Sequence, residues 1–323
     1  MKAIVYTKYG SPQVLGLKDI DRPVPNDNEV LVKISASSIN AQEWHFMRGK
    51  PYIMRLAGTG LLKPKDVRLG ADLAGVIEAV GSNVTEFKPG DEVFGVRWGA
   101  FAEYVNSSGK GLVLKPANVT FEQAAAVPVA ALTALQGLRD KGKIQAGHKV
   151  LVNGAGGGVG TFAVQIAKAF GAEVTGVTNT GNVGMVRSIG ADHVIDYTKQ
   201  DYTQGEERYD LIFDLGGNHS LSERLRVLAT KGTLVMAGSI STGNWLGPLA
   251  SMLKTVLVAP FVSQKLASFL AKVNKEDLHF IKEMLETGKI IPVIDRTFPL
   301  SEVPEAIRYV EEGHTRGKVV ITV

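Results

Sequence analysis

The chain has no cysteine among its 323 residues. Disulfide bonds and thiolate metal sites are therefore excluded, whereas the redox compartment stays open. Histidine is scarce too, and the six histidines include no pair at the helical spacing of metal ligands. Because a catalytic zinc needs about three protein ligands and one open position, we predict a protein without a metal.

Long hydrophobic runs are also missing. The most apolar segment, Trp245–Val262, is interrupted by Pro248, Lys254 and Pro260 and falls short of the ~20 apolar residues of a membrane span. The first residues, Met1–Tyr6, resemble a strand rather than a leader. We therefore expect a cytoplasmic protein with no membrane span. Residues 245–262 form either an apolar wall or membrane-surface contact, or else a dimer interface or core.

Neither sign of charge is in large excess. The 36 basic and 32 acidic residues give a net charge of +4, and they are interleaved, as in Lys275-Glu276 and Lys282-Glu283. We expect no nucleic acid partner, because such partners select clustered basic residues. A weakly basic surface fits an anionic small ligand, and the length suggests about two domains.

What the chain does contain is a glycine-rich turn between a strand and a helix. An apolar strand, Val150–Val152, is followed by five glycines and then by the helical pattern Val159–Phe170. This arrangement places backbone N–H groups and a positive helix end where a pyrophosphate can bind. Ala155, Gly157 and Gly160 stand at the three positions of the dinucleotide fingerprint, with alanine replacing the first glycine. The predicted contacts are Gly154, Gly156, Gly157, Gly158, Val159 and Gly160.

The rest of the pattern changes along the chain. Up to about residue 120 short strands alternate with turns, and beyond it strands alternate with helices, which indicates a parallel sheet covered by helices. The expected strands are 150–152, 173–177, 193–195, 211–213 and 233–236, and the expected helices are 159–170, 182–189 and 220–228. Further on we expect helices at 249–258, 264–272, 275–286 and 302–311, and strands at 290–294 and 318–323.

The end of the second strand of this region indicates which dinucleotide binds. An Asp or Glu about 20 residues past the glycine loop usually binds the adenosine 2′-hydroxyl. The turn Gly176–Asn182 has no acid, and its Thr178 and Asn179 offer hydroxyl and amide donors instead. A carboxylate would repel a 2′-phosphate, so we predict NADPH as the cofactor. Tyr197 is either a further donor or an amphipathic edge residue.

Three more segments carry a family resemblance. They are Gly70–Gly81 with Lys88–Val93, Ala125–Pro128 leading into Leu132-Thr133-Ala134, and the closing Gly313–Val320. With the glycine loop they resemble the zinc-free quinone oxidoreductase branch of the medium-chain dehydrogenase/reductase superfamily. Trp44–Gly49 with Pro51-Tyr52 resembles a subgroup that has chloroplast-envelope and mitochondrial members.

The resemblance implies an α/β fold in two parts. Residues 1–123 and 274–323 would form a GroES-like β-rich catalytic domain, and residues 124–273 an inserted Rossmann domain with a doubly wound parallel sheet. The active site would lie in the cleft between them, and the protein would be a homodimer. Where zinc-dependent relatives carry metal ligands, this chain has Asn40, Ala71 and the apolar pair Val129-Ala130, which supports the absence of a metal.

The resemblance also implies roles for residues outside the glycine loop. Asn40 would lie near the nicotinamide, and Glu43 stands where many relatives carry Asp. His45 and Tyr52 are candidate proton donors, the alternatives being a packing histidine and a core tyrosine. Thr133 is either a cofactor contact or a hydroxyl bonded back to its own helix. The remaining predicted cofactor contacts are Leu215, Gly216, Ala237, Gly238, Ser239, Gly317 and Lys318.

Without a Lewis acid, oxidation of an alcohol at neutral pH is unfavourable. The predicted reaction is therefore NADPH-dependent hydride transfer to a small-molecule acceptor that is already electron-poor, either a quinone or the double bond of an α,β-unsaturated carbonyl. Two alternatives stay open. One is an enoyl-thioester reductase, and the other is a non-catalytic NADPH-binding redox sensor or partner-binding protein.

Overall fold

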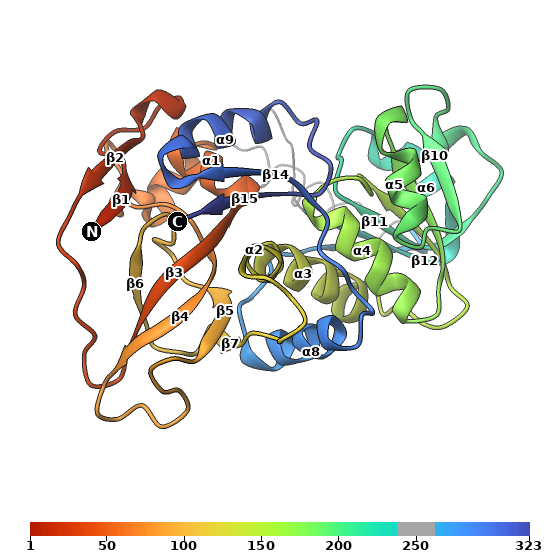
Figure 1. Cartoon of the computed structure of the whole chain (residues 1–323). Coiled ribbons are helices and arrows are strands. Elements are labelled where there is room, and N and C mark those ends of the chain that lie inside the picture. The colour runs from red at the N-terminus through yellow and green to blue at the C-terminus, as the bar shows by residue number, and fades with distance from the viewer. Residues whose placement is uncertain (238–261) are drawn as a thin grey trace. The chain divides into compact units, whose positions relative to one another are not determined.

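Residues 1–237 and 262–323 are described by a computed structural model of the chain, apart from the side chains of residues 57 and 58 (Figure 1). They divide into two units. Unit 1 contains residues 1–132, 273–288 and 292–323, and unit 2 contains residues 133–272 and 289–291. The division falls inside a helix, α3 (Pro128–Leu135). The domain boundaries expected after residues 123 and 273 stay predictions.

A six-stranded parallel sheet forms the centre of unit 2, as the strand–helix alternation predicts. Its order is β10-β9-β8-β11-β12-β13, with the first strand of the unit in the middle, as in dinucleotide-binding folds. The strands are β8 (Lys149–Asn153), β9 (Glu173–Thr178), β10 (His193–Asp196), β11 (Tyr209–Asp214), β12 (Leu228–Met236) and β13 (Lys265–Ser268).

Helices follow these strands and pack against them. Helix α4 (Gly158–Ala169) contacts β8 and β9, α5 (Val183–Ser188) contacts β9 and β10, and α6 (Leu221–Arg226) contacts β12 (Figure 1). Ser220 and Glu223 form a capping box before α6. Most residues of the central strands β8 and β11 are buried, as expected of a parallel sheet covered by helices.

One helix prediction in this region is wrong. Residues 264–272 do not form a helix, since 265–268 make the edge strand β13, which pairs in parallel with Thr233–Met236 of β12. Pairing with an existing sheet edge satisfies backbone groups that a short isolated helix would leave open, and it outweighs the local helix propensity. The helix expected at 249–258 lies outside the described residues.

Unit 1 is built on a seven-stranded sheet, together with a small antiparallel pair of β1 (Lys2–Val5) and β2 (Gly16–Asp19). The large sheet has the order β14-β15-β3-β4-β5-β7, with β6 also paired to β3. Its strands are β3 (Val30–Ile39), β4 (Asp72–Val80), β5 (Glu92–Val96), β6 (Tyr104–Ser107), β7 (Leu112–Leu114), β14 (Ile294–Pro299) and β15 (Lys318–Thr322). Only β14 and β15 pair in parallel, and the strand expected at 290–294 begins where that prediction ends.

The helices of unit 1 bury apolar faces against these strands. Helix α1 (Ala41–Arg48) and helix α9 (Val303–Glu311) contact each other and share a core with Ile4, Met47 and Phe101 (Figure 1). Helix α2 (Phe121–Ala125) begins with a capping box formed by Thr120 and Gln123 and ends before Pro128. Helix α8 (Lys275–Glu286) packs on β7.

Strand register brings three distant segments together at one end of the unit 1 sheet. Ser38 near the end of β3 pairs with Asp72, the first residue of β4, and Ile39 pairs with Val319 of β15. The segment after β3 and the first residues of β4 and β15 therefore meet. Asn40, which caps α1, lies at this meeting point.

Candidate functional site

The glycine loop of unit 2 joins β8 to α4 with almost no space to spare. A Cβ on Gly160 would stand 2.0 Å from the carbonyl oxygen of Gly154, so the helix can approach the loop this closely only with glycine there. Gly157 is different, because among the described residues a Cβ there would meet nothing closer than the same oxygen at 3.5 Å. Gly157, the cap residue of α4, is therefore not closely packed by the part of the chain that the structure describes.

The carboxyl ends of β8 and β11 are joined by a buried polar network. Asp214 Oδ1 accepts hydrogen bonds from Asn153 Nδ2 at 2.7 Å and from the N–H groups of Gly216 and Gly217 at 3.2 and 3.1 Å. Its other oxygen accepts from Arg224 of α6, and both side chains are almost fully buried. The network holds the turn after β11, which contains the predicted cofactor contacts Leu215 and Gly216.

The neighbouring strand β10 brings a carboxylate to the end of β9, where the β9 turn itself has no acid. Asp196, the last residue of β10, pairs with Thr178, and its Oδ2 accepts from the Thr180 hydroxyl at 2.7 Å. Hydrogen bonds from Thr180 and Thr198 hold the pKa of Asp196 down at about 2, so the group is ionised at neutral pH. Lys199 lies beside it, with Nζ 3.4 Å from Oδ2. Reasoning from the β9 turn alone missed this acid, which only the parallel register brings there.

Four other predicted residues of unit 2, Thr178, Asn179, Tyr197 and Ala237, stand at or just after strand ends on the same edge of the sheet. Thr178 is buried, Asn179 accepts a hydrogen bond from the N–H of Asn182, and Tyr197, 50% exposed, donates its own N–H to the carbonyl of Thr178. Ala237 follows β12 and is buried, and Thr133 is half-buried on α3. Gly238, Ser239 and the apolar segment 245–261 lie outside the described residues.

Unit 1 contributes a second polar network, around Asn40. Asn40 Nδ2 donates to Asp72 Oδ2 at 2.8 Å, and Lys318 Nζ donates to Asn40 Oδ1 at 2.6 Å. The Asn40 N–H donates to Glu43 Oε2 at 2.7 Å and closes the start of α1. Burial, with the negative charge of Asp72 second, raises the pKa of Glu43 to about 7. Asn40 itself is half-buried at the margin of this cluster.

The two predicted contacts in the closing segment have structural partners of their own. Lys318 is 2% exposed, and its ammonium reaches three acceptors, namely the carbonyl of Ile39, Asn40 Oδ1 and Asp72 Oδ2. An ammonium has three donors, so none is left for a phosphate. Gly317 has a φ of +93°, and a Cβ there would stand 2.3 Å from the carbonyl of Val293, so the turn itself requires glycine. In this structure Lys318 is a hydrogen-bond partner of Asn40.

The two candidate proton donors differ in their surroundings. His45 Nδ1 lies 3.1 Å from the carbonyl of Lys50, which makes Nδ1 the protonated nitrogen, and burial lowers the pKa of the ring. A neutral imidazole whose only N–H is engaged is a poor acid at neutral pH. Tyr52 is half-buried, with the guanidinium of Arg55 4.8 Å from its ring centre. Tyr52 is the stronger candidate.

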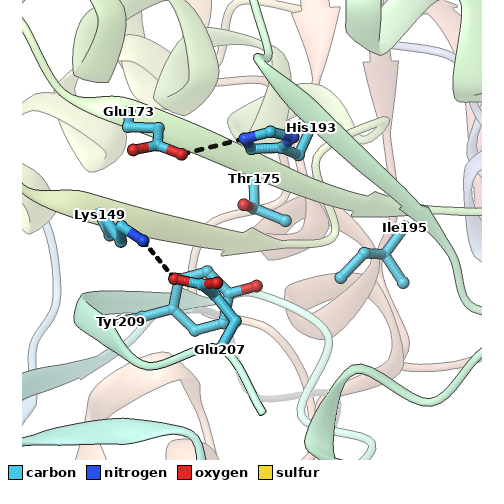
Figure 2. Close-up of a pocket in the computed structure, with 7 residues that line it drawn as sticks. All are labelled: Lys149, Glu173, Thr175, His193, Ile195, Glu207 and Tyr209. Atoms are coloured by element: carbon cyan, nitrogen blue, oxygen red, sulfur yellow. Dashed lines mark hydrogen bonds and ion pairs between the residues drawn. The ribbon is translucent and has the colours of Figure 1, made fainter. Parts of the chain in front are cut away.

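A cavity of about 150 Å³ opens at the opposite edge of the unit 2 sheet, at the amino ends of the strands (Figure 2). His193 lies 3.0 Å from Glu173, and Lys149 is paired with Glu207, so its charged groups already have partners. None of the predicted site residues lines it. The lining residues are Lys149, Glu173, Thr175, His193, Ile195, Glu207 and Tyr209.

Metal ligation has no support in the donor set. In the part of the chain that the structure describes, no three His, Asp or Glu side chains gather closely enough to hold a metal ion. At two of the positions where zinc-dependent relatives carry ligands, Asn40 has both ends of its amide engaged and Ala71 offers a methyl group. These residues do not fit a zinc ion, and the metal-free site stays a prediction. Within residues 1–237 and 262–323, no helix has the length and apolarity of a bilayer span.

Comparison with known proteins identifies the family of the chain. Residues 26–117 match the alcohol dehydrogenase GroES-like domain family, and residues 189–321 match the family described as zinc-binding dehydrogenase. The mitochondrial NAD(P)H oxidoreductase RTN4IP1 of Mus musculus is 35% identical, with 100% of this chain and 89% of the relative aligned. The chloroplastic NADPH-dependent alkenal/one oxidoreductase of Arabidopsis thaliana is 33% identical, with 99% and 79% aligned. The structure of Escherichia coli quinone oxidoreductase complexed with NADPH matches with a TM-score of 0.83 and 25% identity over 100% of both chains.

A β-rich GroES-like unit combined with a Rossmann-type parallel sheet defines a medium-chain dehydrogenase/reductase, and the expected fold class is confirmed. Within that superfamily the chain belongs to the quinone oxidoreductase-like branch, because relatives that align along its whole length belong to this branch. The resemblance inferred from the motifs is therefore confirmed.

Proposed function

We propose that the protein is an NADPH-dependent, metal-independent reductase of quinones or α,β-unsaturated carbonyls. The observation that carries the proposal is the glycine loop at the carboxyl edge of a parallel sheet. Gly160 is closely packed there, whereas Gly157 is not closely packed by the described residues. Full-length relatives named as NADPH-dependent alkenal/one oxidoreductase and quinone oxidoreductase support the acceptor class.

The residues of unit 2 would hold the cofactor. The first N–H groups of α4 and the backbone of Gly157 would bind the diphosphate, and the turn held by Asp214 would contact the ribose on the nicotinamide side. Bound NADPH supplies a hydride donor. The chain then has to orient the reactants, provide a hydrogen-bond donor to the oxygen that gains negative charge, and deliver one proton. Asn40 is the proposed donor, and Tyr52 the proposed proton source.

Turnover assays test the proposal. The purified protein is mixed with NADPH and a panel of quinones, enones and enoyl thioesters, and the absorbance of the reduced cofactor is followed. We expect oxidation with quinones or enones. Turnover with enoyl thioesters alone would instead indicate a carrier-linked reductase. Cofactor binding without turnover of any acceptor would leave only the sensor function and refute the proposal.

The preference for NADPH over NADH rests on a balance of charges near Thr180. Asp196 disfavours a 2′-phosphate, whereas Lys199 and the phenol of Tyr197 favour one. We propose that the favourable groups outweigh the acid. Lys199→Met should weaken NADPH binding and leave NADH binding unchanged, while Asp196→Asn should raise the NADPH preference. Equal effects of either variant on both dinucleotides, measured by titration of cofactor fluorescence, would place the 2′-phosphate elsewhere.

Two further properties are proposed, the first of them on the family likeness alone. We propose a homodimer, which light scattering on the eluting protein measures directly. A cytoplasmic location is also proposed, although relatives are named as mitochondrial and chloroplastic. Fractionation of the source cells decides between these compartments.

A further inference from the structure

The carboxamide of Asn40 is held at both of its ends by charged groups. Nδ2 donates to the Asp72 carboxylate and Oδ1 accepts from the Lys318 ammonium. A rotation by 180° about the last side-chain bond would point an NH₂ group at the ammonium and a carbonyl oxygen at the carboxylate. Both contacts would then be repulsive, so only one orientation of the amide is compatible with this pair.

The two charged residues are almost completely enclosed. Asp72 is 0% and Lys318 2% exposed, and their charged atoms are 3.3 Å apart. Asp72 also accepts from the Ser38 hydroxyl at 2.7 Å and from the Val129 N–H at 2.9 Å. Each charge is thus fully solvated by protein groups. Burying an ion pair adds little net stability, since the loss of hydration offsets the attraction.

The backbone of Asn40 is fixed as well. Its N–H donates to Glu43, and it stands between β3 and α1 as the cap residue of the helix. An amide nitrogen has two hydrogens, and one of those on Nδ2 is used by Asp72. Among the described residues the second has no partner. Since hydrogen-bond partners hold both ends of the amide and Asn40 is only half-buried, this second hydrogen is a donor of fixed orientation that a bound reactant could use.

We propose that Asp72 and Lys318 are positioning residues that orient the Asn40 amide as a hydrogen-bond donor to an oxygen of the bound reactants. This rests on the proposed function, in which an acceptor oxygen gains negative charge during reduction. Neither charged side chain contacts a reactant in this scheme. Their effect on the reaction passes through Asn40 alone, which makes the proposal testable by a double-mutant cycle.

The cycle compares four proteins: the wild type, Asn40→Ala, the neutral pair Asp72→Asn/Lys318→Met, and all three substitutions together. Neutralising both charges avoids leaving a buried charge unpaired, so the fold should be kept. We expect the neutral pair to lower kcat at least tenfold with a small change in KM for NADPH. In the Asn40→Ala background the same two substitutions should change kcat less than twofold. A loss of equal size in both backgrounds would refute the proposal.

Lys115→Met is the matched control. Lys115 is also a buried lysine of unit 1 with three acceptors, namely the carbonyls of Pro116 and Val119 and the carboxylate of Glu92, and it contacts neither Asn40 nor Asp72. Its removal should lower thermal stability and leave kcat unchanged. A fall in kcat in this variant as large as that of the neutral pair would mean that any buried charge lost from unit 1 impairs catalysis, which would refute a specific role for Lys318.

A measurement without substrate separates this inference from the proposed function. The side-chain ¹⁵N resonance of Asn40, assigned by its absence in Asn40→Ala, reports the mobility of the amide in the protein alone. We expect it to be as rigid as the backbone in the wild type and mobile in the neutral pair. An equally rigid amide in both would overturn the inference, even if the wild type reduces quinones. Conversely, a wild type that reduces no acceptor refutes the proposed function, while the NMR result still decides whether the charged pair orients Asn40.

Discussion

Glu43 is a buried acid whose ionisation should destabilise the protein. It is 0% exposed, and burial raises its pKa from the ordinary value of 4.5 to about 7. Between these two pH values the unfolded chain has lost the proton that the folded chain keeps, so stability falls as pH rises. A tenfold change in proton affinity is worth ~1.4 kcal/mol, and the whole difference therefore amounts to about 3 kcal/mol above pH 7.

Glu43→Gln tests this directly. Glutamine keeps the acceptor oxygen that the Asn40 N–H needs, and it is the other residue that capping boxes use at this position. At pH 5 we expect the variant to be more stable than the wild type by less than about 1 kcal/mol. At pH 8.5 the variant should be more stable by up to about 3 kcal/mol. Urea unfolding followed by tryptophan fluorescence measures it, because Trp44 and Trp98 pack on the unit 1 core.

The matched control is a glutamate with the same capping role in an exposed setting. Glu223 accepts the N–H of Ser220 at 2.7 Å, and hydrogen bonds from Ser220 lower its pKa. At pH values above 4.5 the Glu223→Gln variant should therefore be less stable than the wild type, whereas Glu43→Gln should be more stable. The argument is refuted if the stability difference between Glu43→Gln and the wild type is the same at pH 5 and pH 8.5.

Two other substitutions test the local geometry of unit 2. Gly160→Ala forces a Cβ to 2.0 Å from a carbonyl oxygen and should cost about 1–3 kcal/mol and weaken NADPH binding, whereas Gly184→Ala, with nothing within 4 Å, should be neutral or stabilising. Thermal denaturation and cofactor titration compare the two, and equal stabilities would refute the close packing. Arg224→Leu leaves the buried carboxylate of Asp214 unpaired and should destabilise by about 3–5 kcal/mol, while the exposed Arg226→Leu should change little. Equal losses in urea unfolding would show that the buried ion pair has no special effect.

The parallel sheet of unit 2 could be predicted from the sequence because its signals are local. A buried strand is a short apolar run, and a helix that follows a glycine turn shows its own period and cap. The same reasoning was wrong at 265–268, where a short polar-apolar segment becomes an edge strand only because β12 offers it a partner. No local pattern distinguishes such a segment from a weak helix.

The candidate site was predictable only where function depends on backbone. Gly157 and Gly160 could be proposed as cofactor contacts because a phosphate loop requires glycine at fixed spacings, and the spacing is visible in the chain. Asp196 near Thr180 and the pair Asp72–Lys318 were not found, since their partners lie 16 and 246 residues away in the chain.

Strand register decides those contacts, and it makes the two missed groups alike in kind. Asp196, the last residue of β10, stands opposite Thr178, and Asp72, the first residue of β4, stands opposite Ser38. Both acids therefore lie at a strand end. A charged residue at a strand end is unremarkable in a sequence, because solvent usually surrounds it. It acquires a role when the paired strand brings a second polar group to the same level. Charged residues that flank an apolar run are therefore worth testing as pairs once the strand order is known, and in this chain such a pair orients the one amide on which the proposed chemistry depends.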